Sequence, residues 1–250
     1  MRKLCLLLAI ILCASSAFAQ APVEAAEVRY VRTSNWVKMM AKLDYLSPLQ
    51  KEKMAYTWGN RSTWSSYTSL FFTPEASLYR ESDEEFEDVG YKWRKEPFFV
   101  RRDFLNKKMT DILTLEGKTW LVEDSLIAPQ WRVCNDLKEV AGYLCMNAVC
   151  TDTVKRQEIT AWFALDIPSQ AGPERFWGLP GLILEIDIND GALTIVADRI
   201  TPRAPAPESL ALPAKTKAKK INEQGYQEKL DKYVRDKIKA EESFFWGLRY

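Results

Sequence analysis

Short stretches in which apolar and polar residues alternate recur along most of the chain, as in half-buried β-strands. Strands are predicted over residues 28–33, 98–104, 111–115, 119–123, 130–134, 143–151, 158–165, 182–188 and 192–198, and residues 63–79 are strand-like except at Pro74. Glu116-Gly117 and Asn189-Asp190-Gly191 are predicted hairpin turns, because such residues accept the positive φ of tight turns. Most gaps are too short for a crossover helix. The pattern therefore predicts a mainly β fold, either a curved antiparallel meander sheet or a partly open barrel.

Two helices are predicted beside the strands. Ser47-Pro48-Leu49-Gln50 combines an N-cap, a Pro at the first helical position and a capping-box Gln, which predicts a short helix over residues 48–57. Residues 202–216 carry four prolines and are predicted to be a linker, whereas residues 217–250 have the apolar spacing of an amphipathic C-terminal helix with a tail. The lysines at 215, 217, 219 and 220 are expected at the solvated start of that helix, and the acidic residues 81–88 in a surface loop.

Residues 1–19 are typical of a secretory signal peptide. Arg2 and Lys3 precede an apolar stretch that ends at Leu12, and Ala17-Phe18-Ala19 fits a cleavage site before Gln20. Lipidation at Cys13 is not favoured, because the residue before it is not small. No later stretch approaches the roughly 20 apolar residues that span a bilayer. We expect residues 20–201 to form one β-rich domain of an exported protein, peripheral to a membrane at most, in the periplasm, with the cell surface or secretion as alternatives.

The amino-acid composition limits the kinds of binding and catalysis that are open to this chain. With 250 residues, 47% of them hydrophobic, the chain can bury one sizeable core. Its 35 Lys and Arg against 34 Asp and Glu offer no electrostatic reason to bind nucleic acid. The chain has no His, which excludes Ser-His-Asp and Cys-His catalysis and HExxH zinc sites. Any catalysis would use carboxylate, Lys, Tyr or thiol groups, and no metal site or cofactor is predicted.

The densest local signal is the peptide from Gly172 to Ile186, in which Gly and Pro alternate with apolar residues ahead of a buried strand. Residues 178–183 spell GLPGLI, and the chain resembles the family of exported Bacteroidetes proteins that is named after this hexapeptide. Trp131 and residues 142–148, 161–163 and 167–168 precede the motif in the order that the family shows, so the resemblance covers about residues 118–200. It implies a β-rich envelope protein without an established activity, whose genes commonly lie near those of TonB-dependent outer-membrane receptors. It implies no catalytic residue.

The GLPGLI segment has two interpretations. The first is a structural corner, because Gly and Pro suit a tight turn from which the chain re-enters the core. The second is a docking or ligand surface, because exposed loops on rigid sheets often carry recognition. That surface would consist of Trp177, Gly178, Leu179, Pro180, Gly181, Leu182 and Ile183. Phosphate binding is not expected, since the segment lacks the Lys and Ser/Thr of a P-loop and precedes a strand.

Three cysteines follow the predicted cleavage site: Cys134, Cys145 and Cys150. In an oxidising compartment we expect one disulfide and one free thiol. Cys145 and Cys150 are too far apart along one predicted strand to pair, so Cys134–Cys145 is the first choice and Cys134–Cys150 the second. A thiol site for Cu(I) or redox chemistry, with Met146 as a second ligand, is an alternative interpretation.

These observations favour an exported binding or accessory protein that works beside an outer-membrane receptor or another envelope protein. A carboxylate-dependent hydrolase of envelope polysaccharide or peptide is the alternative, and a copper or redox protein the second alternative. Trp64, Trp93 and Trp177 lie beside predicted loops and are the candidate surface aromatics, whereas Glu84 and Glu85 are expected in a solvated loop. The sequence does not define an oligomeric state.

Overall fold

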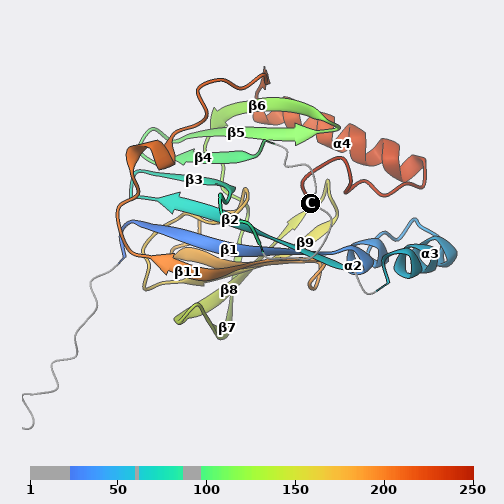
Figure 1. Ribbon diagram of the computed structural model, residues 1–250, viewed down its shortest axis with the longest axis horizontal. Helices are drawn as coiled ribbons and strands as arrows, with labels where there is room; N and C mark the ends of the chain where they lie inside the picture. The colour runs from blue at the N-terminus through green and yellow to red at the C-terminus, as the bar shows by residue number, and fades with distance from the viewer. Residues whose placement is uncertain (1–22, 60–61, 87–96) are drawn as a thin grey trace, which may run out of the picture.

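The computed structural model describes residues 23–59, 62–86 and 97–250, so the predicted signal peptide and Trp93 lie outside the described residues (Figure 1). Its strands form one twelve-stranded sheet in the order β12-β6-β5-β4-β3-β2-β1-β11-β10-β9-β8-β7. The strands are β1 (Ala26–Asn35), β2 (Thr63–Phe72), β3 (Ala76–Glu81), β4 (Phe99–Asp103), β5 (Lys108–Leu115), β6 (Lys118–Ser125), β7 (Arg132–Val140), β8 (Tyr143–Asp152), β9 (Gln157–Ala164), β10 (Leu182–Ile188), β11 (Leu193–Thr201) and β12 (Lys219–Ile221).

The sheet consists of two antiparallel meanders that meet at β1. One meander runs from β1 to β6, and the other from β7 to β11, whose last strand pairs with β1. Only β12 joins in parallel, along β6. The sheet does not close into a barrel, and β7 and β12 are its two edges (Figure 1). The predicted mainly β, curved and open architecture is therefore confirmed.

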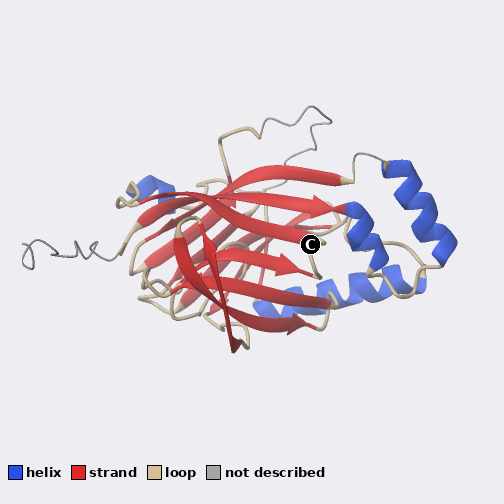
Figure 2. Cartoon of the chain, turned by 90° about the horizontal axis from the view of Figure 1, so that it is seen from below, coloured by secondary structure: helices blue, strands red, loops and turns tan. Residues whose placement is uncertain are grey.

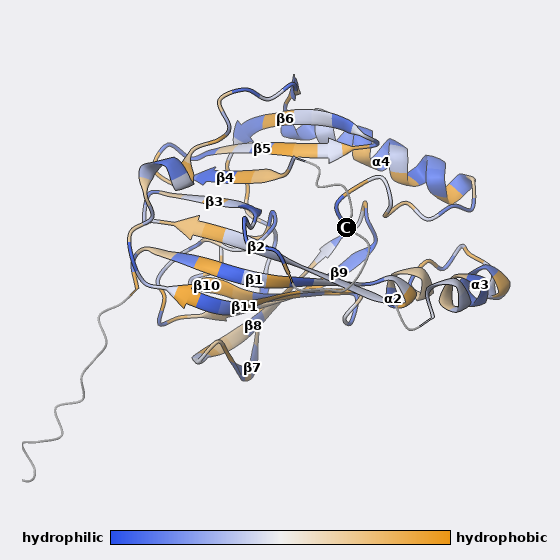
Figure 3. Ribbon diagram, in the orientation of Figure 1, coloured by the Kyte–Doolittle hydropathy of each residue, from blue (hydrophilic) through white to orange (hydrophobic). Residues whose placement is uncertain are grey.

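Alternation along the strands places the core on one face of the sheet. In β1 every second residue is buried, namely Ala26, Val28, Tyr30, Arg32 and Ser34, and the apolar and polar residues of this strand can be followed in Figure 3. Apolar residues of β10 and β11, such as Ile186 and Ile195, pair on the same buried face. Because Arg32 is buried along with apolar neighbours, the interior of the sheet must also contain its counter-charge.

The predicted hairpin turns are present. Glu116 and Gly117 have φ of 51° and 70°, and Asn189, Asp190 and Gly191 have φ of 54°, 57° and 78°. A further turn at Ala141-Gly142 was not predicted, because Ala is not a typical residue for the left-handed region. This turn joins β7 to β8 in a hairpin, and β7 continues to Val140, beyond the predicted strand over residues 130–134. The hairpin forms one edge of the sheet.

Helices α2 (Trp36–Ala41) and α3 (Pro48–Trp58), both in the N-terminal part of the chain, lie toward one end of the sheet (Figure 1), and the long helix runs beside the strands (Figure 2). Helix α3 begins at the predicted capping box, and the preceding α2 was not predicted. Helix α4 (Glu223–Lys239) begins later than expected, because β12 extends the edge of the sheet and Asn222 caps the helix. The Pro-rich residues contain the 3₁₀ helix η1 (Pro207–Leu210) and accept a hydrogen bond from Arg101 at the Leu210 carbonyl. None of the described helices is long and apolar enough to span a membrane.

After α4 the chain turns back between the two halves of the sheet, where its C-terminus is marked in Figure 1. Phe244, Phe245 and Tyr250 belong to the core. Leu248 forms an isolated bridge to Leu115 of β5, and the Asn189 side chain donates a 2.7 Å hydrogen bond to the Tyr250 hydroxyl. We call residues 244–250 the tail segment. It closes the open side of the sheet over the buried charges described below.

Candidate functional site

The GLPGLI corner is a tightly packed connection between β9 and β10. A Cβ atom on Gly181 would lie 2.1 Å from the backbone oxygen of Ala164, and Gly178 has a φ of 92° that favours glycine. Of the seven candidate surface residues, Leu179, Gly181, Leu182 and Ile183 are buried, Gly178 is half-buried and Pro180 is exposed. Trp177 is only 8% exposed, so its prediction as a surface aromatic is wrong. A docking role for this segment stays a prediction that can use little more than Pro180.

The corner supports the segment that leads into β7. The indole of Trp131 donates a 2.9 Å hydrogen bond to the backbone oxygen of Trp177, and its ring lies 6.1 Å from that of Phe176. The Trp177 ring is 6.0 Å from Phe104 beyond the end of β4. The motif therefore joins the start of β7 to the opposite half of the sheet, which explains its apolar content.

Two charged residues of the same loop, Glu174 and Arg175, point into the interior. Glu174 is 6% exposed and has a φ of 53°. Its carboxylate accepts hydrogen bonds from Arg32 Nε at 3.2 Å and from Arg249 Nε at 2.8 Å to each oxygen. Burial alone would raise the pKa of Glu174, but the positive charges of Arg249 and Arg32 outweigh it and lower the pKa below 4.5. Glu174 is therefore an ionised structural anion and a poor general acid at neutral pH.

Arg175 belongs to a second buried chain of charges. It donates from Nε to Asp111 at 2.9 Å and from Nη2 to Glu223 at 2.5 Å. Asp111, which is fully buried, also accepts both Nη groups of Arg102. This chain connects β4 and β5 to the corner and to the first turn of α4, so it holds these elements together.

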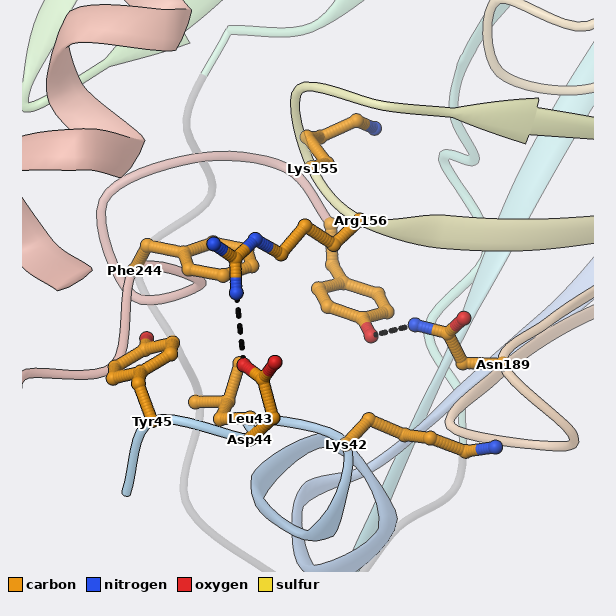
Figure 4. Close-up of a pocket in the computed structure, with 9 residues that line it drawn as sticks. Lys42, Leu43, Asp44, Tyr45, Lys155, Arg156, Asn189 and Phe244 are labelled. Atoms are coloured by element: carbon orange, nitrogen blue, oxygen red, sulfur yellow. Dashed lines mark hydrogen bonds and ion pairs between the residues drawn. The ribbon is translucent and has the colours of Figure 1, made fainter.

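The hollow shown in Figure 4 lies next to the tail segment and has a volume of about 10 Å³, roughly the room for one water molecule. It is lined by Lys42, Leu43, Asp44, Tyr45, Lys155, Arg156, Asn189, Phe244 and Tyr250. Arg156 reaches across it to Asp44 at 2.8 Å, and the amino group of Lys155 lies away from that pair (Figure 4). Burial lowers the pKa of Lys155, whose nearest carboxylate is Asp152 at 3.7 Å. The hollow is smaller than the 300–1,000 Å³ typical of pockets for drug-sized ligands.

The edge strand β7 carries a different kind of surface. Val133, Leu137 and Leu144 are 49%, 59% and 60% exposed, although they are large apolar residues. Val133 pairs with Ala148 and Leu137 with Met146, so both lie on the same face of the hairpin as Leu144. Leu165, 51% exposed, follows the last residue of β9 beside them. We call Val133, Leu137, Leu144 and Leu165 the apolar edge patch.

Neither expected disulfide is present, and Cys134, Cys145 and Cys150 are free thiols. The register explains the error: Lys138 pairs with Cys145, and Cys134 lies in the irregularity between Val133 and Leu137, where it has no regular cross-strand partner. Cys150 faces the opposite side of the hairpin from Cys134, because it has the same parity as Ala148, the partner of Val133. Cys145 and Met146 are adjacent in β8 and face opposite sides, so they do not converge on one ion. Among the described residues no cluster of three or more Cys, Asp or Glu could hold a metal.

The free thiols allow a direct measurement. Burial raises the pKa of Cys145 and of Cys150 to about 11, which keeps both protonated at neutral pH. We expect a thiol reagent at pH 8 to modify half-buried Cys134 first and fully buried Cys145 last, with the order read by peptide mass spectrometry. A Cys134→Ser variant should lose the fast phase. A mass for a crosslinked cysteine pair under non-reducing conditions would contradict the structure.

The other candidate residues, Glu84 and Trp64, are engaged in contacts within the protein or partly buried. Glu84 accepts hydrogen bonds from Arg29 and Arg199, which lower its pKa, so it is part of a surface ion cluster. Trp64 is half-buried in β2. A second aromatic group at the surface, Trp36, Trp58 and Trp246, was missed because its members come from three distant parts of the chain; the Trp36 and Trp246 rings lie 4.9 Å apart.

Sequence reasoning also missed the interior charges. Glu174 and Arg175 stand in the peptide with the strongest local signal, and a charged pair inside an apolar, Gly-rich loop that re-enters a core was the available clue. The residues that bind them, Arg32, Arg249, Asp111 and Glu223, have no local signal, because the sequence around each predicts only a strand, a helix or the tail.

A known protein family matches the part of the chain that contains the GLPGLI corner. Residues 151–185 match the family described as "Protein of unknown function (Porph_ging)", which is associated with Bacteroidetes. This segment includes Glu174, Arg175 and the whole GLPGLI hexapeptide. No curated protein sequence matches the chain.

Two solved structures of PNGF-II, in the C2 and P21 space groups, resemble the fold, with TM-scores of 0.53 and 0.54. Sequence identity is 13% and 12%, and the alignments cover 84% and 83% of this chain. The chain spans 33% of the length of PNGF-II. At this identity the likeness concerns the fold alone. The chain is thus a mainly β protein whose segment 151–185 is similar to a Bacteroidetes-associated family of unknown function.

Proposed function

We propose that this chain is an exported envelope protein that binds an extended segment of a partner protein along β7. The observation that carries the proposal is the apolar edge patch, which lies on and beside the nine-residue edge strand β7. An edge strand presents unpaired backbone N–H and C=O groups, and a partner strand can add to them while its side chains contact exposed apolar neighbours. Long edge strands with exposed apolar residues are otherwise a liability for aggregation.

The surroundings of the patch support binding through a rigid edge. The Trp131 indole ties the start of β7 to the GLPGLI corner, and Lys138 binds Glu185 at 2.6 Å and lies over the Trp162 ring at 4.4 Å. A preorganised edge loses little conformational entropy when a partner adds. The partner proposed from the family resemblance is an outer-membrane receptor of the TonB-dependent type or another envelope protein, and the proposed location is the periplasm.

Leu137→Lys is expected to abolish capture of the partner without a loss of stability, because Leu137 is exposed and a lysine on an edge strand opposes strand addition. Leu105→Lys is the matched control, since Leu105 is 70% exposed and lies between β4 and β5. The tagged variants are compared by affinity capture from native envelope extract with quantitative mass spectrometry.

Hydrogen exchange then locates the contact. Amides of residues 132–140 should gain protection when the captured partner is added to the wild-type protein. Capture that is equal for Leu137→Lys, Leu105→Lys and the wild type, or protection confined to other elements, would show that β7 is not the binding edge.

A further inference from the structure

The side chain of Arg249 makes the kinds of contact that a protein makes with a bound arginine side chain: ion pairs with carboxylates and stacking on an aromatic ring. Its Nε donates to both oxygens of Glu174 at 2.8 Å, and Nη1 donates to Glu81 at 2.5 Å. Its guanidinium carbon lies 3.8 Å from the centre of the Phe98 ring. Carboxylates at two edges of the planar fork and an aromatic ring on its face are the contacts that distinguish a guanidinium from an ammonium group.

The walls of this pocket belong to the sheet and its corner, and not to the tail segment. Glu81 is the last residue of β3, Phe98 directly precedes β4, and Glu174 lies in the corner before β10. Arg32 of β1 also binds Glu174, so that carboxylate is oriented from the framework side. The residues around the Arg249 guanidinium therefore come from elements other than the segment that supplies it.

Arg249 is held there by side chains more than by regular backbone pairing. The tail segment has a single isolated bridge, at Leu248, and a 2.7 Å hydrogen bond from the Glu116 N–H to the Gly247 oxygen. The Arg249 side chain remains 22% exposed. Its Nη2 is buried without a hydrogen-bond partner among the described residues. A buried donor without a partner costs free energy, so the site does not satisfy this occupant completely.

We propose that Glu81, Glu174 and Phe98 form a guanidinium-binding site for an arginine side chain, and that Arg249 fills this site as an internal ligand. The site is separate from the apolar edge patch, so it does not depend on the proposed function.

Chemical rescue tests the proposal on the full chain. In Arg249→Ala, low millimolar methylguanidinium should bind saturably by calorimetry and raise the thermal midpoint, whereas methylammonium, with the same charge but no planar fork, should do neither. The wild-type protein should not respond, because Arg249 occupies the site. In the double variant Arg249→Ala, Glu81→Gln, affinity for methylguanidinium should fall at least tenfold, and in Arg249→Ala, Glu52→Gln it should not change, since Glu52 is exposed on α3.

If Arg249→Ala does not fold by itself, its refolding yield in methylguanidinium against methylammonium provides the same comparison. Selective binding or recovery that depends on Glu81 supports the site. Equal responses to the two cations, no response to either, or a response unchanged by Glu81→Gln would overturn it.

Discussion

Glu174→Gln is expected to lower the free energy of unfolding by about 3–5 kcal/mol, the range for breaking a buried charge pair by removing one partner. The substitution keeps the size of the side chain but removes the charge that faces Arg32 and Arg249. Arg249 retains Glu81, whereas within the described part of the chain Arg32 retains only its 3.0 Å hydrogen bond to the Ser34 hydroxyl. Urea denaturation followed by tryptophan fluorescence measures the loss.

The same variant should change the response to acid. The folded-state pKa of Glu174 lies below 4.5, so its ionised form contributes stability above that pH and the contribution is lost as the pH falls through the folded-state pKa. Glu174→Gln should therefore show a smaller loss of stability between pH 6 and pH 3 than the wild type. Glu52→Gln, on exposed helix surface, should stay within about 0.5 kcal/mol of the wild type. A Glu174→Gln protein as stable as the Glu52 control would mean that the buried charges are not coupled as the structure places them.

Gly181→Ala is expected to be at least as damaging, at about 3 kcal/mol or more, because the added Cβ meets backbone and not a flexible side chain. The nearest atoms are the oxygen and carbon of Ala164, at 2.1 and 2.6 Å, at the end of β9. Relief requires β9 and β10 to separate at the Leu182–Ala164 pair, next to Gly181. Thermal unfolding measures the loss of stability, and the near-ultraviolet circular dichroism of the aromatic residues reports the change in packing.

Pro180→Ala is the control within the same motif. Pro180 is exposed, so its replacement should cost at most about 1 kcal/mol, mainly through the greater freedom of the unfolded chain. Should both variants retain wild-type stability, the motif would not be the packed corner described here, and its conspicuous sequence would need another role.

Local pattern predicted much of the fold because strands, caps and tight turns depend on neighbouring residues. The alternation along β1, the capping box at Ser47 and the positive-φ residues at 189–191 each describe interactions within a few positions. The start of α4 was misplaced, since the edge of β6 draws residues 219–221 into the sheet and no local signal reports that edge. The disulfide failed for a similar reason, because a bulge in β7 shifts the register that the pairing assumed.

The sequence by itself determined the class of the fold, the turns and the chemistry that the chain lacks, since composition and periodicity are properties of the chain alone. Only the tertiary structure decided that Arg249 meets Glu174, 75 positions away, that Arg175 meets Asp111, and that Val133 and Leu137 remain uncovered at an edge. Such contacts depend on which strands end the sheet and which segment closes its open side. The positions of the strands can therefore be predicted from local sequence, whereas the candidate sites depend on how the strands are arranged in the sheet.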